Sequence, residues 1–166
     1  MRIRLLSVGV ALLAAGCGGG GSASTPSVST ADASGKAAYI ARADALCGQF
    51  DVGAKAVQAR LAALRGRDAA TQRREAPPLI RRVAALARGL VARLRALPLP
   101  ASGGAGATAV YDSGEAGATT LGQIADAIEA GDLRRAAALN ARLRVATLQQ
   151  RAAARAYGFR QCASGS

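Results

Sequence analysis

Residues 78–97, PLIRRVAALARGLVARLRAL, decide the fold of this chain. Their apolar members recur at intervals of three and four residues, which places them on one helix face. That face comprises Ile80, Val83, Leu86, Ala87, Leu90, Val91, Leu94 and Leu97. Pro77 and Pro78 fit the opening turn of a helix better than its middle, so residues 68–76 are predicted to form a separate helical piece. Pro98 and Pro100 end the helix.

Three further segments show helical spacing. Residues 36–65 carry one apolar stripe, and residues 108–130 carry a weaker one that is interrupted by glycines. The pair Gly131 and Asp132 then predicts a tight connection, because glycine suits a helix end and aspartate caps the next helix. The last segment runs to Tyr157, where Gly158 ends it.

Four amphipathic segments with short connections predict an all-α domain, an antiparallel up-and-down four-helix bundle over residues 36–162. The composition agrees, since alanine, leucine and arginine dominate and the chain has no tryptophan, three tyrosines and two phenylalanines. Many stripe positions are alanine, so each buried residue contributes less than leucine would. We therefore expect a thin core.

The N-terminus predicts export. Arg2 and Arg4 precede an apolar run that is too short to span a bilayer, and Cys17 follows the small residues Ala14, Ala15 and Gly16. This arrangement resembles the lipobox of bacterial lipoproteins, with Ala14 where leucine is usual. The resemblance implies cleavage of residues 1–16, lipid (palmitate) on Cys17, and attachment to the extracytoplasmic face of the cell membrane. The alternative is an ordinary signal peptide followed by a free thiol.

A flexible tether is expected after the anchor. Residues 17–35 are rich in glycine and serine and hold almost nothing that a core could bury. The four residues 163–166 are expected to form a disordered tail.

The other two cysteines can pair in an exported protein. Cys47 lies on the apolar stripe of the first helix, and Cys162 follows the end of the fourth. In an up-and-down bundle these two ends adjoin, so a short fold-back after Gly158 would bring the cysteines within disulfide range. The alternative is one buried and one exposed thiol.

Residues 39–47, YIARADALC, and 156–162, AYGFRQC, resemble segments of small uncharacterised helical lipoproteins and secreted proteins of high-GC actinobacteria. The resemblance implies a helical domain closed by a cysteine pair, and it carries no activity.

Charge is the main hint of a partner. The chain has 22 basic and 10 acidic residues, and loss of Arg2 and Arg4 would leave 20 against 10. Six arginines recur at helical spacing on the second and fourth helices and are candidates for contact with anionic lipid headgroups or wall polymers. They are Arg81, Arg88, Arg95, Arg144, Arg151 and Arg155. The alternative is that they only solvate helix faces. Nucleic acid is not expected, because no stacking aromatics accompany the arginines.

Catalysis is not expected. The chain lacks histidine, which removes the commonest general base and most transition-metal sites, so we expect no enzyme activity, cofactor or metal. Asp126 with Glu129, and Asp112 with Glu115, are carboxylate pairs that most resemble solvated helix faces. Gln150 falls within the apolar series of the fourth helix, where it would fix register or line a ligand cleft.

The sequence therefore predicts a membrane-anchored, non-enzymatic binding or structural element of the cell envelope. The alternative is a carrier of a small ligand, held in a cleft between the helices.

Overall fold

The computed structural model describes residues 30–164, and all the regular structure in that part of the chain is helical. Four long helices, α1 (Thr30–Ala63), α2 (Ala69–Arg95), α3 (Gly104–Glu129) and α4 (Leu133–Tyr157), pack against one another, and a short helix, α5 (Gln161–Ser164), follows. The prediction of an all-α bundle is confirmed. The expected signal peptide, lipidated Cys17 and most of the tether lie outside the described residues.

Two boundaries differ from those expected. Helix α1 begins at Thr30, inside the segment assigned to the tether. At the other end, Ala163 and Ser164 belong to α5 rather than to a disordered tail, and Ala163 is buried in the core. The bundle therefore includes residues on both sides of the predicted range.

The prediction of a separate helical piece at residues 68–76 is wrong. Helix α2 runs unbroken past Pro77 and Pro78. Its start is fixed by Asp68, whose side chain accepts a hydrogen bond from the Thr71 backbone N–H at 2.9 Å. The prolines leave the carbonyls of residues 73 and 74 without helical partners, but both residues are exposed to solvent. The fully buried Pro77 ring adds packing that offsets part of the cost.

The connection between α3 and α4 is the predicted one. Gly131 adopts a positive φ of 76°, and the Asp132 side chain accepts a hydrogen bond from the Arg135 backbone N–H. Gly158, with a φ of 111°, ends α4 and turns the chain toward α5. These glycines determine where α4 starts and stops.

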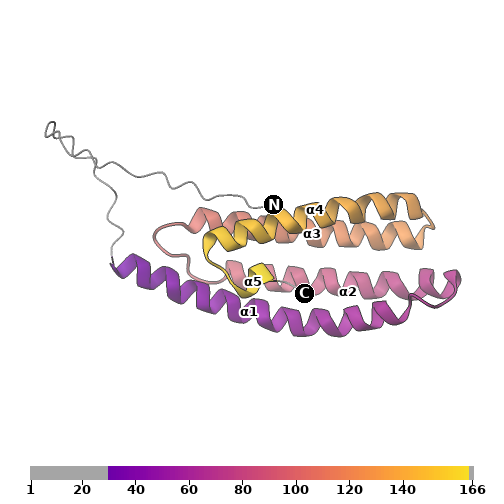
Figure 1. Ribbon diagram of the computed structural model, residues 1–166, viewed down its shortest axis with the longest axis horizontal. Coiled ribbons are helices and arrows are strands. Elements are labelled where there is room, and N and C mark those ends of the chain that lie inside the picture. The colour runs from indigo at the N-terminus through magenta and orange to yellow at the C-terminus, as the bar shows by residue number, and fades with distance from the viewer. Residues whose placement is uncertain (1–29, 165–166) are drawn as a thin grey trace, which may run out of the picture.

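The helices form two pairs, α1 with α2 and α3 with α4, joined by close packing of α2 on α3 (Figure 1). Among the described residues, the backbones of α1 and α4 make no close approach to each other. Helix α5 contacts both and lies between them near one end (Figure 1). One side of the bundle is therefore closed by helix packing, and the opposite side is bridged only at the α5 end.

The packed core lies at the α5 end. It is built around aromatic side chains from α1, α3, α4 and the turn before α5, with small residues between them. Its members are Tyr39, Ala43, Cys47, Val91, Leu94, Ala107, Val110, Tyr111, Ala154, Tyr157, Phe159 and Ala163. The many alanines agree with the thin core expected from the sequence.

Candidate functional site

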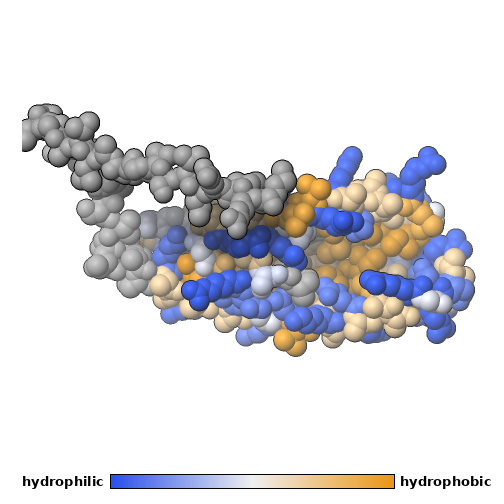
Figure 2. All heavy atoms as spheres, viewed as in Figure 1, coloured by the Kyte–Doolittle hydropathy of each residue, from blue (hydrophilic) through white to orange (hydrophobic). Residues whose placement is uncertain are grey.

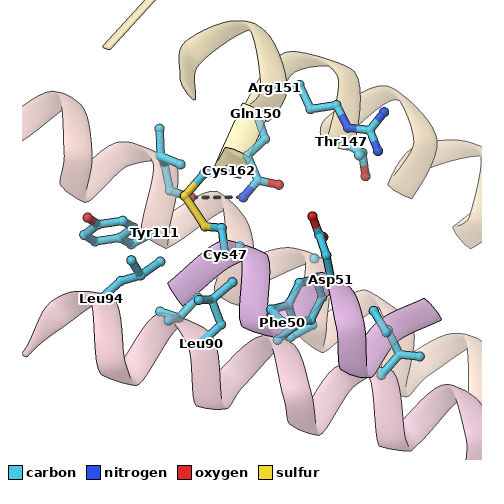
Figure 3. Close-up of a pocket in the computed structure, with 18 of the residues that line it drawn as sticks. Cys47, Phe50, Asp51, Leu90, Leu94, Tyr111, Thr147, Gln150, Arg151 and Cys162 are labelled. Atoms are coloured by element: carbon cyan, nitrogen blue, oxygen red, sulfur yellow. Dashed lines mark hydrogen bonds between the residues drawn. A yellow bond between two sulfur atoms is a disulfide. The ribbon is translucent and has the colours of Figure 1, made fainter. Parts of the chain in front are cut away.

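An apolar cleft runs along the side where α1 and α4 stay apart. Its volume is about 260 Å³, and all four long helices and α5 contribute to its walls. The space-filling view shows a hydrophobic hollow between the two helix pairs, bordered by hydrophilic side chains (Figure 2). The close-up shows side chains from both sides directed into it (Figure 3). The apolar lining is formed by Phe50, Ala54, Val83, Ala87, Leu90, Val91, Leu94, Val110, Tyr111, Ala118, Leu121 and Leu143.

Small residues make room for the cleft. Gly114, Gly117 and Ala118 line it from α3, and Ala54 and Ala87 line it from α1 and α2. Each leaves space that a leucine at the same position would fill. The alanine-rich stripes that thin the core thus also create an apolar space within the bundle.

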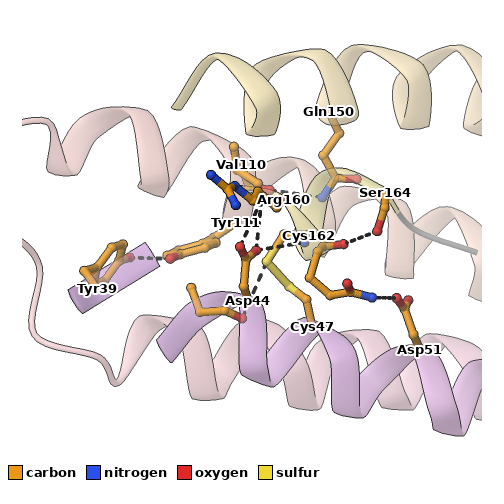
Figure 4. The surroundings of a disulfide bond; sticks show 12 residues. Tyr39, Asp44, Cys47, Asp51, Val110, Tyr111, Gln150, Arg160, Cys162 and Ser164 are labelled. Atoms are coloured by element: carbon orange, nitrogen blue, oxygen red, sulfur yellow. Dashed lines mark hydrogen bonds between the residues drawn. A yellow bond between two sulfur atoms is a disulfide. The ribbon is translucent and has the colours of Figure 1, made fainter. Parts of the chain in front are cut away.

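The disulfide closes one end of the cleft. Cys47 of α1 and Cys162 of α5 are bonded, with their Cα atoms 5.1 Å apart, as the sequence predicted (Figure 4). Both cysteines line the cleft. Phe159, in the turn between α4 and α5, is only 2% exposed and anchors the fold-back that brings Cys162 to α1. Helix α5 therefore holds α1 and α4 at a fixed separation.

Asp44 secures α5 from the α1 side. Its carboxylate accepts hydrogen bonds from the backbone N–H groups of Arg160, at 3.0 Å, and Cys162, at 3.1 Å (Figure 4). These N–H groups lie at the start of a helix and have no partner within it. This role of Asp44, as acceptor for the start of α5, was not predicted from the sequence. The position of Asp44, one turn before Cys47, was the available signal.

A polar group of side chains stands where α1 and α4 face each other across the cleft. Asp51 is only 7% exposed, and its carboxylate accepts a hydrogen bond from Gln161 Nε2 at 2.9 Å. Arg151 and Thr147 approach from α4 (Figure 3). The sequence analysis also missed Asp51, a charged residue placed four positions after Cys47 on the stripe.

Gln150 lines the cleft and also fixes the contact between α4 and α3. Its Nε2 donates a hydrogen bond to the Val110 carbonyl at 3.2 Å (Figure 3). A Cβ atom at Gly114 would lie 3.3 Å from this Nε2 and 3.1 Å from Cγ2 of Val91. The glycine therefore lets the amide pass between the helices. Gln150 thus meets a neighbouring backbone group, as the sequence suggested, and its side chain also lines the apolar cleft.

An aromatic cluster fills the α5 end behind the disulfide. The Tyr39 and Tyr111 hydroxyls share a short hydrogen bond (Figure 4), and the Tyr157 and Phe159 rings lie 4.7 Å apart between centroids. Burial, and then the bond to Tyr39, raise the pKa of Tyr111 well above its usual range. Burial is also the main cause that raises the pKa of Tyr157. The Tyr111 hydroxyl, with its pKa raised, stays protonated at physiological pH, and its hydrogen bond with Tyr39 links α3 to α1.

The three candidate arginines of α2 face carboxylates of α3. Arg81 donates to Asp126 at 2.8 Å and also to Glu129, and Arg95 donates to Asp112 at 2.8 Å. Arg88 Nε lies 3.9 Å from the Glu115 carboxylate. The two carboxylate pairs considered from the sequence are thus the partners of these arginines. Arg81, Arg88 and Arg95 form an ion-pair row along the contact between α2 and α3.

The candidate arginines of α4 lie elsewhere. Arg151 is half-buried in the wall of the cleft, whereas Arg144 and Arg155 are exposed. Helices α2 and α4 are not neighbours in the described part of the bundle, so the six arginines do not form one face.

The described residues hold neither a metal-ligand group nor a helix able to cross a membrane. No group of three or more cysteine, aspartate or glutamate side chains in residues 30–164 is arranged to hold a metal ion. Among the helices described, none combines the length and apolar character that a membrane crossing needs.

Comparisons with known proteins leave the site to be interpreted from its own geometry. No protein-family model, curated protein or solved structure matches this chain.

Proposed function

We propose that this protein is an extracytoplasmic carrier that holds a small, mainly apolar ligand in the cleft between α1 and α4. The observation that carries the proposal is the cleft itself, an apolar space of about 260 Å³ that is lined by all four long helices and includes Gln150 in its wall. Of the two functions considered from the sequence, this geometry favours the carrier. Arg81, Arg88 and Arg95, half of the six candidate arginines, already face carboxylates of α3, which weakens the case for a basic contact surface.

The size and lining of the cleft suit one apolar chain or ring. Ligand pockets usually measure about 300–1,000 Å³, and a dry cavity of about 150 Å³ suffices for benzene. Apolar surface buried there would stabilise a complex by about 25 cal/mol per Å² before the costs of association. A few polar groups at the opening, including Gln150 and Thr147, would orient the ligand.

The proposal assumes that the four helices alternate in direction. Arg81, at the middle of α2, meets Asp126 near the end of α3, while Arg95, at the end of α2, meets Asp112 in the first half of α3. The short connections at residues 64–68 and 130–132 support the same arrangement for the other pairs. In an up-and-down order α1 and α4 are the first and last of the four long helices and face each other, with α5 between them.

We further propose that Cys17 carries a lipid that anchors the carrier to the outer face of the cell membrane. The support is the N-terminal sequence, and a disulfide is consistent with an oxidising compartment. A fatty-acid analogue supplied to growing cells should label the wild-type protein and not Cys17→Ser. Label on both proteins would remove the anchor and leave the cleft proposal unaffected.

The test of the carrier function uses the neutral fluorophore N-phenyl-1-naphthylamine and the full chain with Cys17→Ser. We expect saturable binding with enhanced fluorescence, because the dye leaves water for an apolar site. Gly117→Leu fills the cleft and should weaken binding at least about tenfold. Gly89→Leu is the matched control, since nothing lies within 4 Å of a Cβ there.

Both glycines lie in helices, so leucine raises helix propensity at either site, and circular dichroism should show folded variants. Absence of saturable binding to the parent protein would overturn the proposal. Equal binding by the parent and both variants would overturn it too, because the dye would then occupy another surface.

A further inference from the structure

We infer that the ligand is a single-chain amphiphile with an anionic head, whose tail enters the cleft and whose head lies against cations of α1 and α4. This inference rests on the proposed carrier function and specifies the ligand class. The head is a carboxylate or a phosphate, since both accept hydrogen bonds from arginine and lysine.

Lys55 lies on the α1 edge of the cleft. Asp51 and Gln58 line the cleft, and Lys55 is four residues after the first and three before the second. Residues at these spacings share one flank of a helix. Lys55 is exposed, and no ion pair involves it among the described residues. Its ammonium group is therefore available beside the opening.

Arg144 occupies the corresponding place on α4. Leu143, Thr147 and Arg151 line the cleft from α4. Arg144 is adjacent to the first, three residues before the second and seven before the third. Arg144 is exposed, and no carboxylate pairs with it in the described part of the chain. Arg155 continues the same flank one turn after Arg151. Arg144, Arg151 and Arg155 thus form a basic edge along this flank of α4.

An apolar residue interrupts this basic edge. Leu148 lies four residues after Arg144 and three before Arg151, and it is 63% exposed. A leucine in that position gives apolar contact to the part of a chain that leaves the cleft. A large exposed apolar side chain between cations is what an amphiphile would cover.

The acidic groups of the cleft are concentrated toward α5. Asp44 accepts two backbone N–H groups at the start of α5, and Asp51 accepts from Gln161 of α5. Lys55 lies further along α1 from the disulfide than either, and Arg144 lies further from α5 along α4 than Arg151. Lys55 and Arg144 therefore border the cleft at the end away from these carboxylates. The head belongs there, and the tail extends over the apolar floor toward the disulfide.

The volume limits the tail to one chain. A cleft of about 260 Å³ lies below the range of most drug-sized pockets, so a two-chain lipid would leave most of one tail in water. Each methylene that enters the cleft adds to affinity, whereas the cations discriminate between heads. Chain and head can accordingly be tested separately.

The experiment compares four ligands that share a dodecyl chain and differ in the head. Dodecanoate, dodecyl phosphate, dodecanol and dodecyltrimethylammonium each displace N-phenyl-1-naphthylamine from the full chain carrying Cys17→Ser at low ionic strength. We expect both anions to bind about tenfold more tightly than dodecanol, and the cation to bind most weakly. A preference between the two anions identifies the head as carboxylate or phosphate. The advantage of the anions should shrink in about 0.5 M salt, where screening is strong.

A charge-matched pair of double variants locates the head. Lys55→Gln with Arg144→Gln should remove the advantage of the anions and leave dodecanol unchanged. Arg60→Gln with Arg142→Gln makes the same change in net charge on the same two helices. Arg60 lies two positions from Gln58, and Arg142 lies two positions from Arg144, which is about 200° around each helix. The control pair of substitutions should therefore leave all four affinities unchanged.

The outcomes separate the two proposals. Equal displacement by the anions and dodecanol, or tightest binding of the cation, would overturn the anionic head and leave the carrier standing. An equal loss in both double variants would also overturn it, because net charge rather than Lys55 and Arg144 would then be responsible. Failure of dodecanol and both anions to displace the dye would remove the carrier function itself.

Discussion

Arginines and apolar residues are arranged differently on two sides of the bundle. One side is the contact between α2 and α3, and the other is the facing pair of α1 and α4. Along α2 and α3 the helices pack closely, and Arg81, Arg88 and Arg95 of α2 face carboxylates of α3. Along α1 and α4 the backbones stay apart, the space between them is apolar, and the α4 edge keeps exposed arginines. Under the proposed function, the contact between α2 and α3 stabilises the bundle, and the ligand binds on the side between α1 and α4.

The disulfide should produce the largest effect, because it fixes α5 between α1 and α4. Cys47 and Cys162 are 115 residues apart, and closing a loop of that size stabilises a fold by about 5 kcal/mol in the chain-entropy model. Cys47→Ser with Cys162→Ser, in the Cys17→Ser background, should lower the free energy of unfolding by most of that amount. Urea denaturation measures it. A loss under about 1 kcal/mol would show that the packing of Phe159 and Asp44 holds α5 in place without the covalent bond.

The aromatic end of the cleft should tolerate no added volume. A Cβ at Gly106 would lie 2.9 Å from Cδ2 of Tyr157, whose ring is packed against Phe159. Gly106→Ala should therefore destabilise the protein by about 1–3 kcal/mol, less the gain in helix propensity. Gly89→Ala is the control, because its Cβ meets nothing and it should stabilise by about 1 kcal/mol. Thermal unfolding that ranks the two variants in the reverse order would show that the ring moves freely.

The tyrosines at this end predict a loss of stability in alkali. The pKa of Tyr111 is raised in the folded protein by burial and by Tyr39, whereas in the unfolded chain it ionises near about 10. The unfolded state therefore loses this proton first, and stability falls as pH rises above about 10, by about 1.4 kcal/mol at pH 11. Below pH 9 this contribution is fully present. Tyr111→Phe should make the pH profile between 9 and 11 flatter, as measured by urea midpoints, and an unchanged slope would contradict the assignment.

The sequence predicted the parts of this molecule that depend on local pattern. Helical periodicity located all four long helices, and Gly131 and Asp132 marked a connection because their conformational and capping preferences are local. The cysteine pair was predictable from an argument about helix ends. The prolines of α2 led to a wrong prediction. The energetic cost of a proline within a helix is local, whereas the burial of Pro77 that offsets this cost comes from tertiary packing.

The cleft depended on information that no single segment contains. Its width is determined by α5, a helix of one turn in a segment whose last residues resembled a tail. Likewise, the spacing of Arg81, Arg88 and Arg95 was visible, but their partners follow from the register of α3 against α2. Gln150 was singled out, with a cleft as one of two roles considered, since an amide within an apolar series is unusual. Asp51 was not, because one acidic residue on a long helix is ordinary.

The smallest predicted effects on stability compare the ion-paired arginines of α2 with an exposed arginine of α4. Both members of the Arg81 pairs are largely exposed, so Arg81→Gln should lower the free energy of unfolding only slightly, and a double-mutant cycle with Glu129→Gln isolates the coupling. Arg88→Gln should cost less still, because its Nε stands 3.9 Å from Glu115. Arg144→Gln should cost nothing or slightly stabilise the fold, since it removes a cation from a basic edge without breaking a pair. If Arg144→Gln destabilised the protein as much as Arg81→Gln does, the arginine would be a structural residue, and the contrast between the two sides of the bundle would fail.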